Sequence, residues 1–146
     1  ASNVDEAISR LTNPPINLPK QLLSSLGLIV VQHRNRRTGT RRTFQVAELD
    51  EKGTPNLLMQ LDHTSDKVKQ VGQPIRTLNT LNLYTGMSVT QIQAEIEEKI
   101  AVLQWLLDKD INDINKIGLI MSDYYTEKEH LMRIIKSNQD YSSIEK

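Results

Sequence analysis

The sequence predicts an α+β fold: a helix, a proline-rich turn and a second helix, then an arginine-rich β-hairpin with one or two further strands, and last a helical C-terminal region. Three observations predict it. Prolines crowd residues 13–19, the stretch RRTGTRRT at residues 36–43 is typical of a hairpin turn, and from residue 75 apolar residues recur at helical spacing. We therefore expect two domains, residues 1–73 and residues 74–146.

The first part of the chain, before residue 28, is expected to comprise two short helices. Residues 3–12 are expected to be helical, with Asn3 as the N-cap, and the prolines of residues 13–19 impose an extended connection. Pro19 suits the first turn of a second helix over residues 19–26, because its missing N–H is not needed there. Gly27 is the expected stop.

The next segment is expected to form the β-hairpin. Residues 28–37 form the first strand, Thr38 and Gly39 a two-residue turn, and residues 40–49 the returning strand. Gly39 is expected to take a positive φ. Two further strands are expected at residues 56–61 and 67–71, paired with each other.

The C-terminal region is expected to consist of helices. Ser88 and Gln91 form a capping box for a long helix, Asn112 or Asp113 opens the next, and Thr126 with Glu129 caps the last. The expected core stripe of the long helix is Val89, Ile92, Ile96, Ile100, Leu103, Leu106 and Leu107. In the next helix we expect Ile114, Ile117, Met121 and Tyr124 to point inward. Residues 137–146 are expected to be a frayed tail.

Composition excludes several kinds of chemistry. The 146-residue chain has no cysteine, which excludes disulfides, thiolate metal sites and a cysteine nucleophile. No apolar run approaches the roughly 18 residues of a membrane span. Residues 1–55 hold eight Lys or Arg and five Asp or Glu, a net charge of +3, and the remainder therefore carries −3. Such polarity fits an intersubunit contact as well as a nucleic-acid surface.

No complete active site is recognisable. The P-loop pattern is missing, the three histidines share no ligand spacing, and the paired acids Glu97 and Glu98 are expected on a solvated helix face. The segment DHTSD at residues 62–66 offers Asp62, His63 and Asp66 to a cation, but such residues between strands more often form a turn. We expect no metal site.

The candidate binding residues are the arginines of the hairpin: Arg34, Arg36, Arg37, Arg41 and Arg42. Arg34 and Arg36 are expected on one strand face and Arg37 on the other. Clustered guanidinium groups repel one another, so an anion is expected nearby: a nucleotide phosphate, a nucleic-acid backbone or the carboxylates of a neighbouring subunit. The alternative is a solvated edge that prevents strand-to-strand aggregation.

A helix-turn-helix is the alternative for residues 76–96. Its would-be recognition helix carries Glu95, Glu97 and Glu98 against Lys99, and a net negative helix is repelled by phosphates. A structural helical hairpin is therefore favoured, and a nucleic-acid-binding adaptor is kept as the alternative function.

The order of these motifs resembles a known family, the archaeal type II and type IV secretion ATPases, which include the motors of archaeal pili and the archaellum. The resembling residues are Arg10-Leu11, Pro14-Pro15 to Pro19, Ser25-Leu26, Leu28 to Val31 and the hairpin to Glu48. Further along, the similarity includes Gly86-Met87, the long acidic helix, Trp105 and Tyr124-Tyr125.

The resemblance implies the C-terminal portion of a hexameric ATPase that couples ATP hydrolysis to protein export or filament assembly. It assigns residues 1–73 to the end of a RecA-like lobe and residues 74–146 to appended helices. The family's P-loop and other catalytic motifs lie upstream of the matched segment, so we expect no catalytic residue, cofactor or ATP hydrolysis in this chain, whereas the intact protein uses ATP and magnesium.

The resemblance also implies partners. These are the upstream part of the same ATPase, neighbouring subunits and a membrane platform protein, with no nucleic acid, at the cytoplasmic face of the membrane. The five arginines are then candidates for contacts to nucleotide or to a neighbouring subunit.

Overall fold

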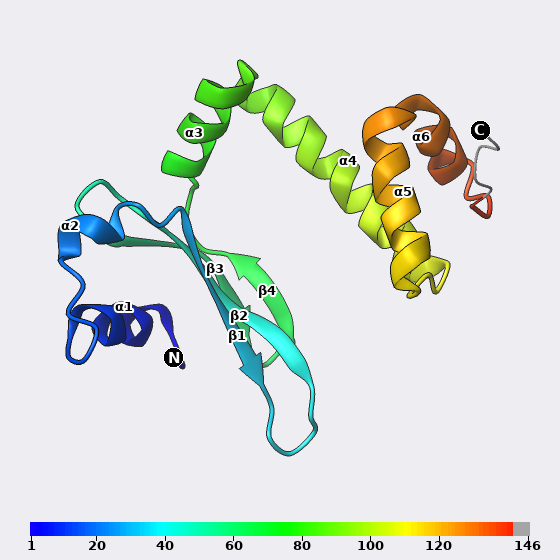
Figure 1. Ribbon diagram of the computed structural model, residues 1–146. Helices are drawn as coiled ribbons and strands as arrows, with labels where there is room; N and C mark the ends of the chain where they lie inside the picture. The colour runs from blue at the N-terminus through cyan, green and yellow to red at the C-terminus, as the bar shows by residue number, and fades with distance from the viewer. Residues whose placement is uncertain (142–146) are drawn as a thin grey trace. The chain divides into compact units, whose positions relative to one another are not determined.

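The computed structural model describes residues 1–141 and confirms the α+β fold, with six helices and one four-stranded antiparallel sheet in that range. The chain divides into two compact units, Ala1–Gly86 and Met87–Lys146. Figure 1 traces the elements along the chain. Each unit is described by itself.

The lead helices differ in how well their sequence predicted them. Helix α1, Val4–Thr12, begins as expected at Asn3, whose Oδ1 accepts the Glu6 N–H at 2.7 Å. Helix α2 is only Lys20–Leu23, shorter than expected. The chain after it continues in tight turns, where Ser25 N–H bonds Leu22 O, so the α-helical ladder stops before Gly27.

The sheet has the strand order β1–β2–β3–β4, formed by Leu28–Arg34, Arg41–Leu49, Pro55–Asp62 and Lys67–Gln70. The two further strands and their pairing are confirmed. Helix α1 packs on the β1–β2 part, where Val4 joins Val31 and Ala47 in a small core. The Val4 N–H also donates to Gln45 Oε1 at 2.8 Å, which fixes the start of α1 against β2.

Helix α3, Arg76–Thr85, is held to the sheet by a buried carboxylate. Glu48 of β2 is 2% exposed and accepts the backbone N–H groups of Ile75 at 2.8 Å and Thr77 at 2.9 Å, together with the Thr77 hydroxyl. The residue before α3, Ile75, offers no side-chain cap. Glu48 therefore takes the place of an N-cap and satisfies donors that the helix itself leaves unpaired.

Arg76 makes a second attachment. Its guanidinium donates to the backbone carbonyls of Leu49 and Ser24, so the first turn of α3 is joined to the end of β2 and to the residue that follows α2. This links three elements that are far apart in sequence. Glu48 and Arg76 together place α3 with the sheet, in the first compact unit.

The second unit contains α4, Val89–Asp108, α5, Ile114–Thr126, and α6, Lys128–Lys136. The Ser88–Gln91 capping box is confirmed, and Asp113 is the N-cap of α5. The capping box expected at Thr126 and Glu129 is wrong. Helix α5 extends through Thr126, whose hydroxyl donates to Ser122 O, and α6 begins without a side-chain cap.

The core of this unit lies on a different face of α4 from the one expected. It comprises Val102, Trp105, Leu106, Ile120, Tyr124, Leu131 and Ile134. Of the expected α4 stripe only Ile92 and Leu106 are buried, and five members are 45% to 74% exposed. In α5, Tyr124 is buried as expected, whereas Ile114 is 76% exposed and Ile120, which was not among the expected residues, is fully buried.

The tail beyond α6 is held at its start. Trp105 Nε1 donates to Gln139 O at 3.2 Å, and the Tyr141 hydroxyl donates to Asp123 Oδ2 at 2.8 Å. The expectation of a frayed tail is therefore wrong for residues 137–141. Residues 142–146 lie outside the described part of the chain.

Candidate functional site

The hairpin connection is longer than the expected two-residue turn. Strand β1 ends at Arg34, and Asn35 starts a six-residue loop to Arg41 because its Oδ1 accepts the N–H groups of Arg37 at 2.9 Å and Thr38 at 3.1 Å. Gly39 has the expected positive φ of 74°. Arg36 and Arg37 accordingly lie in the loop, and their expected assignment to opposite strand faces is wrong.

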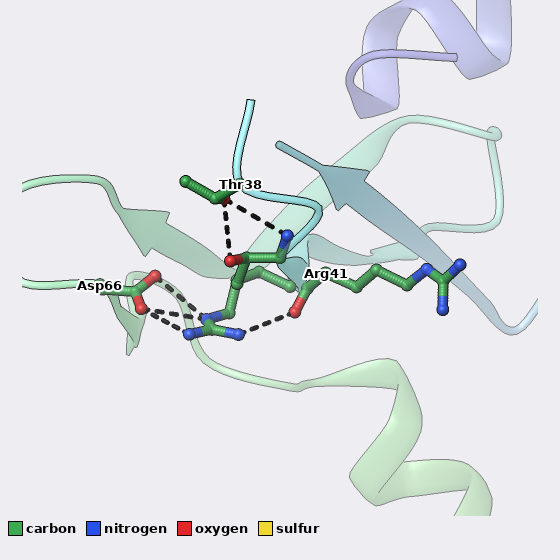
Figure 2. Close-up of polar contacts among 5 residues, drawn as sticks. Thr38, Arg41 and Asp66 are labelled. Atoms are coloured by element: carbon green, nitrogen blue, oxygen red, sulfur yellow. Dashed lines mark hydrogen bonds and ion pairs between the residues drawn. The ribbon is translucent and has the colours of Figure 1, made fainter. Parts of the chain in front are cut away.

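The strand register sorts the other three arginines into two groups. Arg34 is the cross-strand partner of Arg41, and the neighbouring pair is His33 with Arg42. Because successive side chains of a strand point to opposite faces, Arg34 and Arg41 share one face and Arg42 lies on the other. Figure 2 shows the Arg41 side chain pointing away from Asp66.

Arg42 is neutralised by an acid from another turn. Its Nη2 lies 2.6 Å from Asp66 Oδ2 and its Nε 3.1 Å from both carboxylate oxygens (Figure 2). The hydrogen bonds and charge of Arg42 lower the pKa of Asp66, and those of Asp66 raise the pKa of Arg42. Asp66 belongs to the turn between β3 and β4, 24 residues from Arg42 in sequence, so no local pattern predicted the pair.

Four arginines of the hairpin form no ion pair within the described residues: Arg34, Arg36, Arg37 and Arg41. All four are exposed. The structure therefore concentrates four unneutralised guanidinium groups at the end of one hairpin, which extends past the rest of the sheet (Figure 1). Such a group of cations can bind an anion or an acidic surface with bidentate geometry.

Two histidines meet beside this hairpin, which the sequence did not predict. The ring centroids of His33 and His63 are 6.3 Å apart, and the Phe44 ring lies 5.5 Å from His63. The two histidines, Arg42 and Asp66 border a pocket of about 310 Å³. Only the sheet pairing of strands far apart in sequence could have revealed this group.

The DHTSD segment forms a turn, as expected. Asp62 accepts the Thr64 N–H at 2.9 Å and pairs with Lys69, whose hydrogen bond lowers the pKa of Asp62. Asp66 is engaged by Arg42. Within the described residues no group of three or more metal-ligating side chains is arranged to hold a metal ion.

Glu98 was expected to be solvated, and this expectation is wrong. It lies half-buried between α4 and the two later helices, where it accepts the Tyr124 hydroxyl at 2.7 Å and pairs with Lys128 at 2.5 Å. Burial, followed by the hydrogen bond to Glu98, raises the pKa of the Tyr124 hydroxyl well above its ordinary value. Glu98 thus joins three helices and is a structural group.

Comparison with known protein families identifies the C-terminal part of the chain. Residues 72–144, half of the chain, match the PilB3-like, C-terminal family. An α+β chain with this helical second unit is therefore related to pilus ATPases. The chain belongs to the PilB3-like, C-terminal family.

A longer relative carries the similarity over nearly the whole chain. Uncharacterized protein MJ0781 of Methanocaldococcus jannaschii is 27% identical over 144 residues, which cover 93% of this chain and 20% of that protein. The chain thus spans about a fifth of the length of the curated relative it matches. Within the described residues, no helix combines the length and apolar character needed to cross a membrane.

Proposed function

We propose that this chain is the C-terminal portion of a hexameric ATPase of archaeal type II secretion or type IV pilus assembly. ATP hydrolysis, with magnesium, takes place in another part of the intact protein and moves this portion, which passes force to a platform protein at the cytoplasmic face of the membrane. The chain alone does not hydrolyse ATP.

The match of residues 72–144 to the PilB3-like, C-terminal family is the observation that carries this proposal. The similarity to a protein about five times as long agrees with a part of a larger machine. The four unneutralised arginines add a physical reason, because a cluster of exposed cations is suited to carboxylates or phosphates supplied from outside the unit.

In this proposal the hairpin contacts a neighbouring subunit or its bound nucleotide. Arg34 and Arg41 present two guanidinium groups on one face, and Arg36 and Arg37 extend from the loop. Arg42 serves a different purpose, since its partner Asp66 already occupies it and fixes the β3–β4 turn beside the hairpin.

The test uses the intact ATPase and the 146-residue chain in parallel. The reading frame around this segment is expected to encode a P-loop, and the purified chain is expected to show no ATP turnover. In the intact protein, Arg41→Glu should lower the ATPase rate at least about tenfold, because charge reversal repels the same anion. Lys52→Glu, which reverses an exposed cation in another turn of the same unit, should leave the rate unchanged.

A nucleic-acid-binding adaptor is the second candidate, favoured by the same four arginines. It predicts micromolar binding of single or double strands that weakens steeply between about 50 and 200 mM salt. Fluorescence anisotropy of the chain with labelled DNA at these two concentrations distinguishes the functions. Micromolar, salt-sensitive binding together with a reading frame that lacks a P-loop would overturn the ATPase proposal.

A further inference from the structure

An apolar stripe on α4 is left uncovered by the other described helices of its own unit. Its members are Val89, Ile96, Ile100, Leu103 and Leu107, with exposed fractions of 48%, 45%, 58%, 54% and 74%. The core of the second unit uses another face of the helix, through Val102, Trp105 and Leu106. Exposed apolar side chains arranged contiguously along a helix mark an interaction surface.

The spacing of this stripe is that of a coiled coil. Val89, Ile96 and Leu103 are seven residues apart, and Gln93, Ile100 and Leu107 form a second series with the same interval. The two series alternate at steps of four and three, as the d and a positions of a heptad repeat do. A helix that exposes both series fits another helix with the same repeat.

We propose that this stripe together with Gln93, six residues that we call the α4 seam, pairs with the α4 seam of a second copy of the chain, with the two helices parallel. In that alignment each seam residue meets its own equivalent, so all six layers from Val89 to Leu107 are used. Gln93 meets Gln93, where two amides can hydrogen-bond and fix the register. Antiparallel alignment sets Gln93 against an apolar residue or shortens the overlap.

The residues beside the seam are compatible with this pairing. At the flanking positions, Lys99 of one copy lies beside Gln104 of the other, and Glu97 has no acidic counterpart across the seam. Lys99 is also neutralised by Glu95 of its own helix at 2.6 Å. No like charges are therefore brought together, which is the common obstacle to self-association of a charged helix.

The buried area is that of a weak but specific interface. Six roughly half-exposed side chains from each copy bury on the order of 1,000 Å² in total, the lower limit of a specific interface. A dimer with a dissociation constant in the micromolar range is expected. If the proposed function holds, the pairing would join the copies of a six-subunit ring as three pairs.

Sedimentation equilibrium of the 146-residue chain over roughly 1–500 µM measures the pairing. Ile100→Glu should weaken dimerisation at least about 30-fold, because the charge is placed in the centre of the seam. Ala101→Glu is the matched control: it adds the same charge one residue away, on the exposed polar face that includes Glu97 and Asp108. It should leave the dimer intact.

Single cysteines test the orientation, since the chain has no cysteine of its own. Ile100→Cys and Leu107→Cys should each give disulfide-linked dimers on mild oxidation, whereas Ala101→Cys should not. An antiparallel pair could link only the position nearest its symmetry axis. A folded chain that stays monomeric throughout, or a dimer insensitive to Ile100→Glu, would overturn the proposal and leave a helix of another protein as the occupant of the seam.

Discussion

Glu48 is the residue on which the attachment of α3 depends. Burial raises its pKa, but the Thr77 N–H, the Asn56 amide and the Ile75 N–H, together with the Thr77 hydroxyl, outweigh burial and lower the pKa from its ordinary 4.5 to about 2. The folded state therefore binds the ionised form more favourably than the unfolded state does. A pKa difference of this size corresponds to about 3 kcal/mol of stability.

Replacing Glu48 with Gln is expected to destabilise the first unit by roughly 2–3 kcal/mol at pH 7, because a neutral amide turns an NH₂ group toward backbone donors. Since the folded pKa is depressed, the stabilisation is complete above pH 4.5 and is lost as the pH falls toward 2. Urea unfolding followed by circular dichroism should show the difference between the two proteins shrinking over that range. A difference that does not vary with pH would exclude a role of the charge.

Asp66 controls how many hairpin arginines are available. Asp66→Asn removes the ion pair with Arg42 and adds a fifth free guanidinium group. Binding of a labelled single-stranded oligonucleotide, used as a general polyanion, should tighten about threefold, and its log–log salt slope should steepen by up to about 1. Asp62→Asn is the control, because it removes the same charge in the same turn but frees Lys69. Equal effects of both variants would show that only net charge matters.

At the scale of elements, the sequence predicted helix caps and turns, but it did not predict which face of a helix is buried in the core. Asn3, Ser88 and Asp113 cap their helices as the sequence indicates, since each cap bonds a residue three positions away. Helix α4 carries two apolar stripes, and the sequence favoured the one that turned out to be exposed. Which stripe is buried depends on where α5 and α6 pack, and periodicity alone does not contain that information.

The candidate site was predictable to the same extent. The arginines and the left-handed Gly39 follow from residues close in sequence, whereas the Arg42–Asp66 pair and the meeting of His33 with His63 depend on strand pairing. In the sequence analysis, Glu48 was named only as the end of the hairpin that resembles the ATPase family. Its function as a cap for α3 spans 27 residues and needs the fold.

The β2–β3 loop is sensitive to a single added methyl group at Gly53. Gly53 has a φ of 76°, and a Cβ atom there would lie 2.7 Å from Lys20 O and 3.1 Å from Leu23 Cβ. Gly53→Ala should therefore lower the unfolding free energy by about 3 kcal/mol. Part of this cost comes from the positive φ, which alanine rarely adopts, and part from pushing α2 away from the loop. Gly39→Ala, with a φ of 74° and open space around it, should cost about 1 kcal/mol. Similar costs for both would contradict the close approach of α2.

At the scale of the whole molecule, two units with separate cores carry opposite charge. Ala1–Gly86 holds eleven Lys or Arg against seven Asp or Glu, and Met87–Lys146 holds seven against eleven, so the units have net charges of +4 and −4. The core of the first unit centres on Val31 and Ala47, and that of the second on Trp105 and Ile120. Separate cores imply that each unit can respond to a mutation by itself.

The single tryptophan makes this independence measurable. Trp105 is 3% exposed in the core of the second unit, so its fluorescence reports unfolding of that unit. Ile120→Ala should lower the urea midpoint of the fluorescence transition, by about 3 kcal/mol of unfolding free energy, because it leaves a cavity beside Trp105. Glu48→Gln should leave the fluorescence midpoint unchanged while it lowers the midpoint of the first unit, followed through its β-sheet signal. A fluorescence transition that shifts equally with both substitutions would mean that the chain unfolds as one cooperative body.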